Sequence, residues 1–125
     1  MKVKDIMSRI VASSDRYLRV TEAAKFMARS RSRALIVIAE GAPIGIVTAG
    51  DIMRKVVSRG FTGAELTVED IYTEPIITIG QEATVEEARE IMLKNRIRHL
   101  PVVENSRVVG IATKMSLLYK VKQEL

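Results

Sequence analysis

A chain of 125 residues, 47% of them hydrophobic, is long enough for one compact domain or two very small ones. Aromatic residues make up only 4% and tryptophan is absent, so the core must be built from aliphatic side chains. The absence of cysteine excludes disulfides and thiolate metal sites, and a single histidine excludes a histidine-rich metal site. A net charge of +5 at pH 7 allows anionic ligands or nucleic acid as partners.

The sequence gives no indication of a membrane protein or of an enzyme. No apolar run approaches the length of a membrane span, and the first residues lack the apolar stretch of a signal peptide. We therefore expect a soluble, cytoplasmic protein without membrane contact. The sequence also offers no nucleophile–base pair, no set of metal ligands and no Walker-type phosphate loop. We expect neither enzymatic activity nor a bound metal or cofactor.

The chain consists of two similar halves. Sliding the sequence by 65 positions aligns residues 3–57 with residues 68–122 without a gap, and identical pairs run from Val3/Val68 to Val56/Val121. Neither half is large enough to bury a good core by itself, so we expect the two to form one pseudo-twofold module. The predicted division is 1–60 for the first repeat, 61–66 for a linker and 67–125 for the second repeat.

Each half shows the same order of elements in its hydrophobic pattern. We expect a helical turn, a short strand, an amphipathic helix, two strands joined by a hairpin turn, and a closing helix. In the first half these are residues 3–7, 10–12, 20–27, 34–47 and 50–58, and in the second half residues 68–72, 76–79, 85–92, 99–112 and 115–123. A β-α-β-β-α order that occurs twice predicts a mixed α/β (α+β) fold.

The two amphipathic helices differ in their start signals. Thr84 and Glu87 have the spacing of a capping box, in which the threonine hydroxyl and the glutamate bond to backbone N–H groups. Arg19 takes the place of the threonine in the first half. We therefore expect a weaker start for the first helix.

Thr48 and Asp51 stand where the return strand of the first half gives way to its closing helix. A helix start offers free N–H groups and a positive dipole end, which suit an anion. A threonine hydroxyl adds a hydrogen bond to such an anion, and a carboxylate three residues later can accept from a diol such as that of ribose. The same pair is also, and more commonly, an ordinary helix cap. The second half repeats the turn as Thr113 and Ser116.

Several short motifs, weak singly but specific together, extend over essentially the whole chain. They are Val-x-Asp-Ile at residues 3–6 and 68–71, Val85-Glu86-Glu87-Ala88 leading to Met92, Arg98-His99-Leu100-Pro101-Val102-Val103, and Gly45-Ile46-Val47-Thr48-x-x-Asp51. With these motifs the chain resembles a tandem pair of CBS (cystathionine β-synthase) domains, a Bateman module.

The resemblance implies a fold and a function. Two β-α-β-β-α repeats are expected to pack sheet to sheet about a pseudo-twofold axis, with two clefts between them. Clefts of this family bind adenosine compounds such as AMP, ADP, ATP or S-adenosylmethionine and its derivatives. Two modules usually pair into a flat disk, and modules of this kind regulate attached or partner enzymes, channels and transporters without catalysing reactions themselves.

The resemblance also implies the residues of the first cleft. They are Ile46, Thr48, Gly50, Asp51, Pro75, Ile76, Ile77, Ile97, Arg98 and His99. Asp51 would accept hydrogen bonds from the ribose 2′- and 3′-hydroxyls. Thr48, the helix start, Arg98 and His99 would hold phosphate through charge-assisted contacts, while the isoleucines of the second repeat would form an apolar slot for adenine.

The second cleft departs from the family pattern. Its expected residues are Ile10, Val11, Ser32, Arg33, Ala34, Ile111, Thr113, Met115 and Ser116. Ser116 is shorter than aspartate and neutral, so it should grip ribose less well. Ala34 replaces the family's histidine, and Ile36 replaces its proline. We expect this cleft to be weaker, empty or selective for another ligand.

Three hypotheses follow. The first is a stand-alone regulatory protein, an energy sensor of the adenine-nucleotide type, that signals to an unidentified partner and forms a homodimer. The second is a dimerisation scaffold with degenerate clefts. The third is a basic nucleic-acid-binding module, against which the scarcity of aromatic stacking platforms counts. The sequence names neither the ligand nor its number of phosphates, and it leaves parallel and antiparallel dimers both open.

Overall fold

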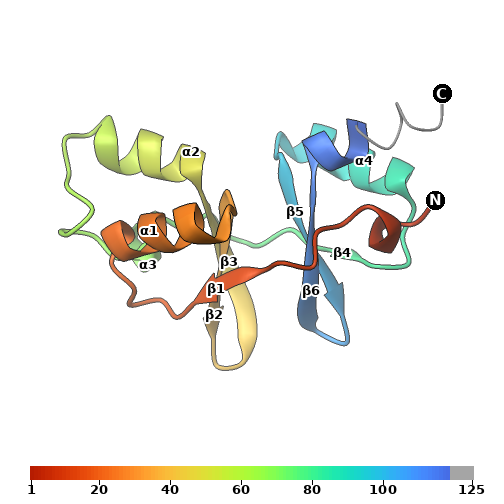
Figure 1. The fold of residues 1–125 in the computed structure, drawn as a ribbon, viewed down its shortest axis with the longest axis horizontal. Coiled ribbons are helices and arrows are strands. Elements are labelled where there is room, and N and C mark those ends of the chain that lie inside the picture. The colour runs from red at the N-terminus through yellow and green to blue at the C-terminus, as the bar shows by residue number, and fades with distance from the viewer. Residues whose placement is uncertain (119–125) are drawn as a thin grey trace. The chain divides into compact units, whose positions relative to one another are not determined.

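In the computed structural model, which describes residues 1–118, the chain forms two three-stranded sheets with accompanying helices (Figure 1). The strand orders are β1-β2-β3 and β4-β5-β6. In each sheet the first strand pairs in parallel with the second, and the second pairs antiparallel with the third. This confirms the predicted α+β fold with one strand pattern used twice.

The elements follow the predicted order in both halves. The first half contains η1 (Val3–Asp5, a 3₁₀ helix), β1 (Ala12–Ser14), α1 (Val20–Ser30), β2 (Ala34–Ala39), β3 (Ala42–Thr48), α2 (Ala49–Ile52) and η2 (Met53–Val57, a π-helix). The second half contains α3 (Val68–Ile71), β4 (Ile79–Gly80), α4 (Val85–Asn95), β5 (His99–Glu104) and β6 (Arg107–Thr113). Residues 114–118 are helical, and positions 119–123 of the predicted closing helix lie outside the described residues.

The compact units of the chain do not coincide with its sequence repeats. One unit is Ala12–Ile76, and the other joins Met1–Val11 to the chain from Ile77 onward. We call them the central unit and the composite unit. Each combines the larger part of one repeat with the opening segment of the other repeat. Repeats and compact units are therefore two different divisions of the same chain.

Backbone hydrogen bonds anchor each opening segment. In the composite unit, Ser8 and Ile111 exchange two N–H···O bonds of 2.9 Å each. In the central unit, Ile46 and Thr73 exchange two bonds of 3.2 and 2.8 Å. Because position 8 corresponds to 73 and position 46 to 111, the two anchors are equivalent under the repeat.

The opening strands lie later than the apolar runs that predicted them. We expected strands at residues 10–12 and 76–79, and the structure has β1 at Ala12–Ser14 and β4 at Ile79–Gly80. Only the last residue of each run enters a sheet, and Ile10 is 67% exposed. The prediction was wrong here because the chain passes from one unit to the other within these runs, so they cannot pair along their whole length.

The two hairpins confirm the predicted turns. The residue pairs between the strands are Glu40-Gly41, with φ of 53° and 78°, and Asn105-Ser106, with φ of 50° and 66°. Positive φ at both positions is the mark of a two-residue type I′ turn, whose twist matches that of the strands. Both hairpins also carry a register shift at the same repeat position.

The helix starts also follow the sequence. Thr84 caps α4, its hydroxyl accepting from the Glu87 N–H at 3.1 Å, so this half of the predicted capping box is present. Arg19 makes no side-chain cap for α1, as expected, and instead donates to the Ala64 carbonyl at 2.9 Å. Both helices are 11 residues long, because their packing against the sheets outweighs the difference in caps.

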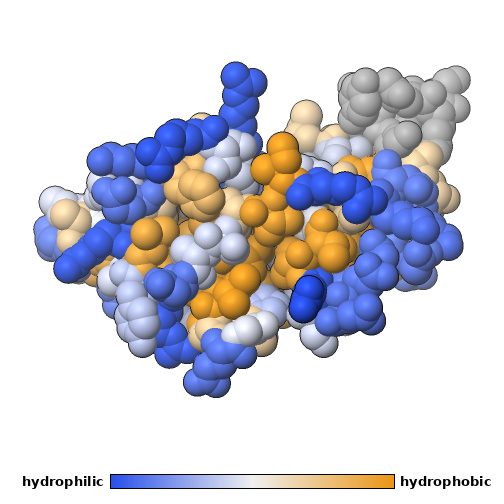
Figure 2. All heavy atoms as spheres, turned by 60° about the horizontal axis from the view of Figure 1, so that its bottom comes forward, coloured by the Kyte–Doolittle hydropathy of each residue, from blue (hydrophilic) through white to orange (hydrophobic). Residues whose placement is uncertain are grey.

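Each unit has its own aliphatic core, as the composition predicted. The buried residues of the central unit are Ala12, Val20, Ala23, Met27, Leu35, Val37, Val47, Val56, Val68 and Ile71. Those of the composite unit are Val3, Ile6, Ile79, Val85, Ala88, Met92, Leu100, Val102, Ala112 and Leu117. On the face drawn in Figure 2, hydrophilic side chains predominate toward the periphery and hydrophobic ones gather in patches between them. Among residues 1–118, no helix has the length and apolar character needed to cross a bilayer.

Candidate ligand-binding site

The predicted turn at Thr48 and Asp51 is a reciprocal capping box between β3 and α2. The Thr48 hydroxyl oxygen accepts from the Asp51 N–H at 3.2 Å. Oδ2 of Asp51 accepts from the Thr48 N–H at 2.9 Å and from the Thr48 hydroxyl at 3.2 Å. The structure therefore confirms the cap interpretation of these two residues.

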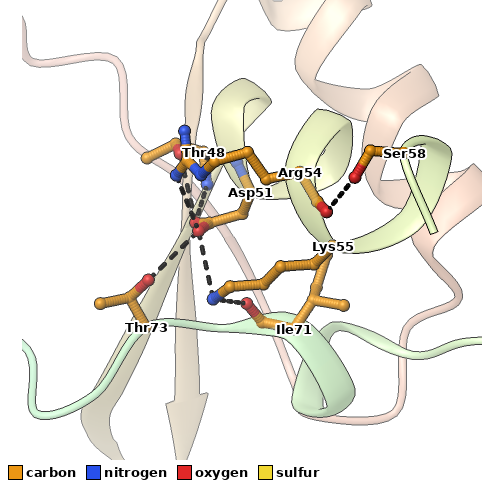
Figure 3. Close-up of polar contacts among 7 residues, drawn as sticks. All are labelled: Thr48, Asp51, Arg54, Lys55, Ser58, Ile71 and Thr73. Atoms are coloured by element: carbon orange, nitrogen blue, oxygen red, sulfur yellow. Dashed lines mark hydrogen bonds and ion pairs between the residues drawn. The ribbon is translucent and has the colours of Figure 1, made fainter.

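Asp51 is the one buried charged residue among residues 1–118, and its side chain is 3% exposed. Its second oxygen, Oδ1, accepts from the Thr73 hydroxyl at 3.3 Å and lies 3.3 Å from Lys55 Nζ and 3.5 Å from an Arg54 nitrogen (Figure 3). A carboxylate offers about four acceptor sites. Internal donors therefore occupy both oxygens of Asp51.

Lys55 and Thr73 tie this carboxylate to the opening segment of the second repeat. Besides contacting Asp51, Lys55 Nζ donates to the carbonyl of Ile71 at 2.8 Å (Figure 3). The motif analysis singled out neither Lys55 nor Thr73. The sequence offered one indication for Lys55, which follows Asp51 by four residues and so lies on the same helix face. It offered none for Thr73, because Thr73 reaches Asp51 only through the tertiary fold.

Arg54 covers the start of α2. A Cβ atom at Gly50 would lie 2.7 Å from an Nη atom of Arg54, so the absence of a side chain at Gly50 leaves room for the guanidinium. The Arg54 side chain is 70% exposed and anchored at its backbone by the Ser58 hydroxyl, which donates to the Arg54 carbonyl (Figure 3). An exposed guanidinium at a helix start can pair with a phosphate or carboxylate in the fork geometry that arginine favours.

The closing helix changes its winding after Ile52, one residue beyond Asp51. Residues Met53–Val57 form the π-helix η2, and the Ser58 N–H bonds to the Met53 carbonyl five residues back at 2.9 Å. Single π-turns inside helices are rare and occur often at functional positions. Lys55, the donor that links Asp51 to Ile71, lies within this segment.

The second turn has the same geometry without the charge. Thr113 N–H donates to Ser116 Oγ at 3.0 Å, and Ser116 N–H donates to Thr113 Oγ1 at 3.1 Å. Ser8 is the repeat equivalent of Thr73, but its hydroxyl accepts from Ile10 N–H at 3.2 Å and makes no bond to Ser116. Among residues 1–118, no side-chain hydrogen bond therefore links the second turn to its opening segment.

Both predicted clefts draw residues from both units. Of the first set, the central unit contains Ile46, Thr48, Gly50, Asp51, Pro75 and Ile76, and the composite unit contains Ile77, Ile97, Arg98 and His99. Of the second set, the composite unit contains Ile10, Val11, Ile111, Thr113, Met115 and Ser116, and the central unit contains Ser32, Arg33 and Ala34. Which side chains of different units share a ligand stays a prediction.

Within each unit, a basic residue lies beside the turn. The carbonyl of Arg33 accepts from Ala49 N–H at 3.1 Å, and the carbonyl of Arg98 accepts from Lys114 N–H at 3.0 Å. A backbone hydrogen bond thus joins each turn to the arginine of its own repeat. This neighbourhood was not part of the sequence prediction, which assigned each arginine to the other turn.

Two glycines accommodate the opening segments. A Cβ atom at Gly45 would overlap the ring of Tyr72, and one at Gly110 would lie 2.8 Å from the Ser8 carbonyl. Partial burial raises the pKa of the Tyr72 phenol, and its hydrogen bond to Glu74, 3.2 Å long, raises that pKa further. Tyr72 therefore stays a neutral donor beside the site. The described residues contain no group of three or more acidic or histidine side chains that could hold a metal.

Comparison with known families gives two matches to the CBS domain, at residues 3–58 and 68–123. Among curated relatives, an uncharacterised protein of Methanopyrus kandleri is 39% identical over 85 residues, which are 67% of this chain and 43% of that protein. The mitochondrial CBS domain-containing protein CBSX3 of Arabidopsis thaliana is 35% identical over 99 residues, which are 75% of this chain and 48% of that protein. The chain thus spans about half the length of these relatives.

Solved structures agree in fold over the whole chain. A putative signal-transduction protein with CBS domains from Burkholderia ambifaria is 27% identical, with a TM-score of 0.92 and coverage of 99% of this chain and 96% of that one. The CBS domain pair of protein MJ0100, in complex with 5-methylthioadenosine and S-adenosyl-L-methionine, is 29% identical, with a TM-score of 0.90 and coverage of 100% and 98%. A hexameric CBS-CP12 protein from bloom-forming cyanobacteria is 28% identical, with a TM-score of 0.91 and coverage of 96% and 71%.

Proposed function

Because this chain belongs to the CBS domain family, we propose that it is a regulatory module that binds an adenosine-containing ligand at the Thr48–Asp51 turn. The ligand is AMP, ADP, ATP or a derivative of S-adenosylmethionine. The module acts in the cytoplasm as a homodimer and passes the state of its ligand site to a partner protein. It carries out no catalysis of its own. A homologous domain pair that contains two adenosine compounds supports the ligand class.

The observation that carries this proposal is the buried carboxylate of Asp51 with its ring of donors. The 2′- and 3′-hydroxyls of ribose can donate two hydrogen bonds to one carboxylate. The Thr73 hydroxyl and the Lys55 ammonium supply the same kind of contact to Oδ1 in the protein by itself. When ribose binds, its hydroxyls replace the Thr73 hydroxyl and the Lys55 ammonium as donors to Asp51. The carboxylate is already in position, and Thr73 and Lys55 lose their contacts with it.

The charge of the ligand distinguishes the candidate compounds. Arg54 and Lys55 place two cations next to Asp51. They favour a phosphate on the 5′ side of the ribose over the positively charged sulfonium of S-adenosylmethionine. We therefore rank adenine nucleotides above S-adenosylmethionine for this turn. At the neutral turn of Thr113 and Ser116 no such ranking applies, and its expected weaker binding stays part of the proposal.

One observation favours a second candidate function, a dimerisation scaffold with unused clefts. Both oxygens of Asp51 have internal donors, and its side chain is 3% exposed. A purely structural carboxylate would have the same surroundings. The two functions differ in whether any adenosine compound can displace the internal donors.

A thermal-shift panel at matched salt tests the proposal, with AMP, ADP, ATP, S-adenosylmethionine, methylthioadenosine, NAD and guanine nucleotides. A ligand present at about 100 times its Kd should add roughly 2.7 kcal/mol to the free energy of unfolding, a shift of several degrees. A selective shift by one adenosine compound is the expected result. A flat panel would favour the scaffold.

The site assignment is tested by calorimetric titration of Asp51→Asn at a temperature where the variant is folded. We expect at least a tenfold loss of affinity. The amide of asparagine has one acceptor oxygen, and its NH2 group cannot accept a hydrogen bond from a ribose hydroxyl. Asp70→Asn is the matched control: Asp70 makes the same capping box, accepting from Thr67 N–H at 2.8 Å, but lies on α3 outside the predicted site. Equal effects of the two substitutions would contradict the assignment.

A further inference from the structure

One lysine of the closing helix bridges the predicted ligand-binding turn and the opening segment of the second repeat. Lys55 Nζ lies 3.3 Å from Oδ1 of Asp51 and donates to the Ile71 carbonyl at 2.8 Å (Figure 3). We call these two contacts the Lys55 tether. Ile71 is the last residue of α3, and the end of a helix leaves carbonyls without a partner in the helix and favours a nearby cation.

The segment that follows α3 is largely exposed. Residues 73–75 are exposed, and residues 74–76 belong to no helix or strand. The backbone is fixed at Thr73, which exchanges two hydrogen bonds with Ile46. After Ile76 the chain leaves the central unit. Because little of this segment is packed, side-chain contacts contribute a large share of what holds it in place.

The carboxylate of Asp51 keeps Lys55 at the Ile71 carbonyl. A lysine side chain has many rotamers, and holding it in one of them costs entropy. The Lys55 side chain is 32% exposed, so water can solvate its ammonium when the carboxylate no longer attracts it. One bond to a neutral carbonyl competes less well with water than two contacts that include a buried carboxylate. The bond to Ile71 therefore depends on the availability of Asp51.

A ligand at the turn removes this attraction. When ribose hydroxyls donate to Oδ1 of Asp51, they take the place of the Lys55 ammonium, and a phosphate on the ligand offers that ammonium another anion. The Thr73 hydroxyl, which donates to the same oxygen at 3.3 Å, loses its acceptor as well. Two side-chain contacts between the turn and the opening segment are then lost, while the backbone bonds of Thr73 remain.

We propose that Lys55 is a positioning residue that makes the opening segment of the second repeat sensitive to the ligand: occupancy of Asp51 releases the Lys55 tether and loosens residues 71–76. The inference rests on the proposed function and adds its regulation, because it names the segment whose mobility the ligand changes. A bound ligand ordinarily protects the residues around it, so a segment that loosens on binding is a distinctive result.

The second turn provides a comparison within the same chain. Ser116 carries no charge that could hold a lysine, and among residues 1–118 its side chain bonds only to Thr113. The opening segment of the first repeat is held instead by ion pairs of Lys2 and Lys4 with Glu82, which belongs to neither turn. We therefore expect this segment not to loosen when a ligand binds at Asp51.

Amide hydrogen exchange measured by NMR tests the inference on the full-length protein, with saturating AMP and S-adenosylmethionine in separate samples. The amides of Tyr72 and Thr73 donate to backbone carbonyls and report on the segment. We expect the compound that binds to raise their exchange rates at least threefold and to leave the amide of Ser8 unchanged. In Lys55→Met, the rates of Tyr72 and Thr73 should already be raised without ligand and should change less than twofold when it is added.

Two controls separate the ammonium of Lys55 from a general effect of substitution. Lys25→Met removes an exposed lysine of α1, outside the turn, and should keep the full ligand response. Because the chain contains no cysteine, Lys55→Cys can be alkylated selectively with 2-bromoethylamine, which forms a thioether and restores an ammonium at nearly the length of lysine. We expect this product to regain the response, and the same variant alkylated with iodoacetamide to lack it.

Binding of uncharged adenosine gives a second test, because coupling between two sites is reciprocal. If ribose must displace Lys55, removal of Lys55 makes ribose binding easier, and adenosine has no phosphate for the lysine to attract. In calorimetry, Lys55→Met should bind adenosine about threefold more tightly than the unmodified chain, and Lys25→Met should bind it equally. Unchanged, weaker or undetectable binding to Lys55→Met would contradict the displacement.

The remaining outcomes distinguish this inference from the proposed function. A compound that binds but slows the exchange of Tyr72 and Thr73, or leaves it unchanged, would overturn the inference and leave the ligand site standing. A full response in Lys55→Met would mean that another contact carries it and would also overturn the role of Lys55. Absence of binding by both AMP and S-adenosylmethionine in calorimetry would overturn the proposed function and this inference together.

Discussion

In the central unit the opening segment of the second repeat is held by a buried carboxylate, whereas in the composite unit the opening segment of the first repeat is held by exposed ion pairs. Asp51 reaches Thr73 directly and Ile71 through Lys55. Lys2 and Lys4 instead donate to Glu82 at 2.6 and 2.9 Å, with all three side chains exposed. The backbone pairs at Ile46/Thr73 and Ser8/Ile111 remain equivalent.

The difference shows how the two copies could diverge. A backbone pairing that is the same in both units fixes where each opening segment lies, and side chains are then free to differ. The carboxylate stands in the turn where Lys55, Arg54 and Thr73 supply donors or cations to it. A buried charge without such partners would be costly. The same turn in the composite unit is neutral and needs none.

The largest expected effect comes from removing the buried carboxylate. Asp51→Ala should lower the free energy of unfolding by about 3 kcal/mol, since it breaks a buried ion pair and a helix cap together. Ser116→Ala should cost only about 1 kcal/mol, because a neutral cap is lost. Urea unfolding measures both. Equal costs would mean that the two turns contribute alike despite their difference in charge.

The glycines beneath the opening segments should show a smaller contrast. Gly45→Ala would push against the rigid ring of Tyr72, and Gly110→Ala against Met7, whose side chain can move, and the Ser8 carbonyl. Overpacking of this kind costs roughly 1–3 kcal/mol, so we expect about 3 for Gly45→Ala and about 1 to 2 for Gly110→Ala. Thermal unfolding by circular dichroism would decide; a larger effect at Gly110 would contradict the comparison.

Lys55→Met separates the link to the opening segment from the cap. It removes the donor to the Ile71 carbonyl and a contact to Asp51, and we expect a loss of about 1 kcal/mol in the free energy of unfolding. Arg54→Met is the matched control on the same helix, with an effect near zero because its side chain is 70% exposed. If both variants unfold at the same urea concentration, Lys55 does not link η2 to α3.

The smallest effect concerns the exposed ion pairs of Lys2 and Lys4 with Glu82 in the composite unit, which we call the clamp. This effect depends on pH. Hydrogen bonds from Lys2 and then Lys4 lower the pKa of Glu82 to about 2. The same Glu82 contact raises the pKa of Lys4. A carboxyl whose pKa is lowered on folding adds stability above its ordinary pKa of 4.5, and this is lost as pH falls from there toward 2.

Glu82→Gln should therefore lower the Tm slightly at pH 7, and the difference from the unmodified chain should vanish near pH 2. High salt should also shrink it, because exposed pairs are screened. A difference in Tm that stays constant between pH 2 and pH 7 would show that the clamp does not act through the charge of Glu82.

Local sequence patterns determined much of this protein. Short runs of apolar residues predicted β2, β3, β5 and β6, and residues 40–43 indicated a hairpin turn. Thr84 indicated the start of α4, and the scarcity of aromatic residues predicted aliphatic cores. Such features depend on neighbours within a few positions of the chain, which is why they are visible without a structure. The duplication further showed which positions in the two halves are equivalent.

The tertiary structure decided what the duplication left ambiguous. Because the two halves align without a gap, the opening segment of either repeat would find equivalent backbone partners on its own half or on the other. Only the fold shows that Ser8 pairs with Ile111 and Thr73 with Ile46. The donors that surround Asp51 follow from that exchange: Lys55 is local, but Thr73 lies 22 residues away and reaches the carboxylate only because its segment docks there.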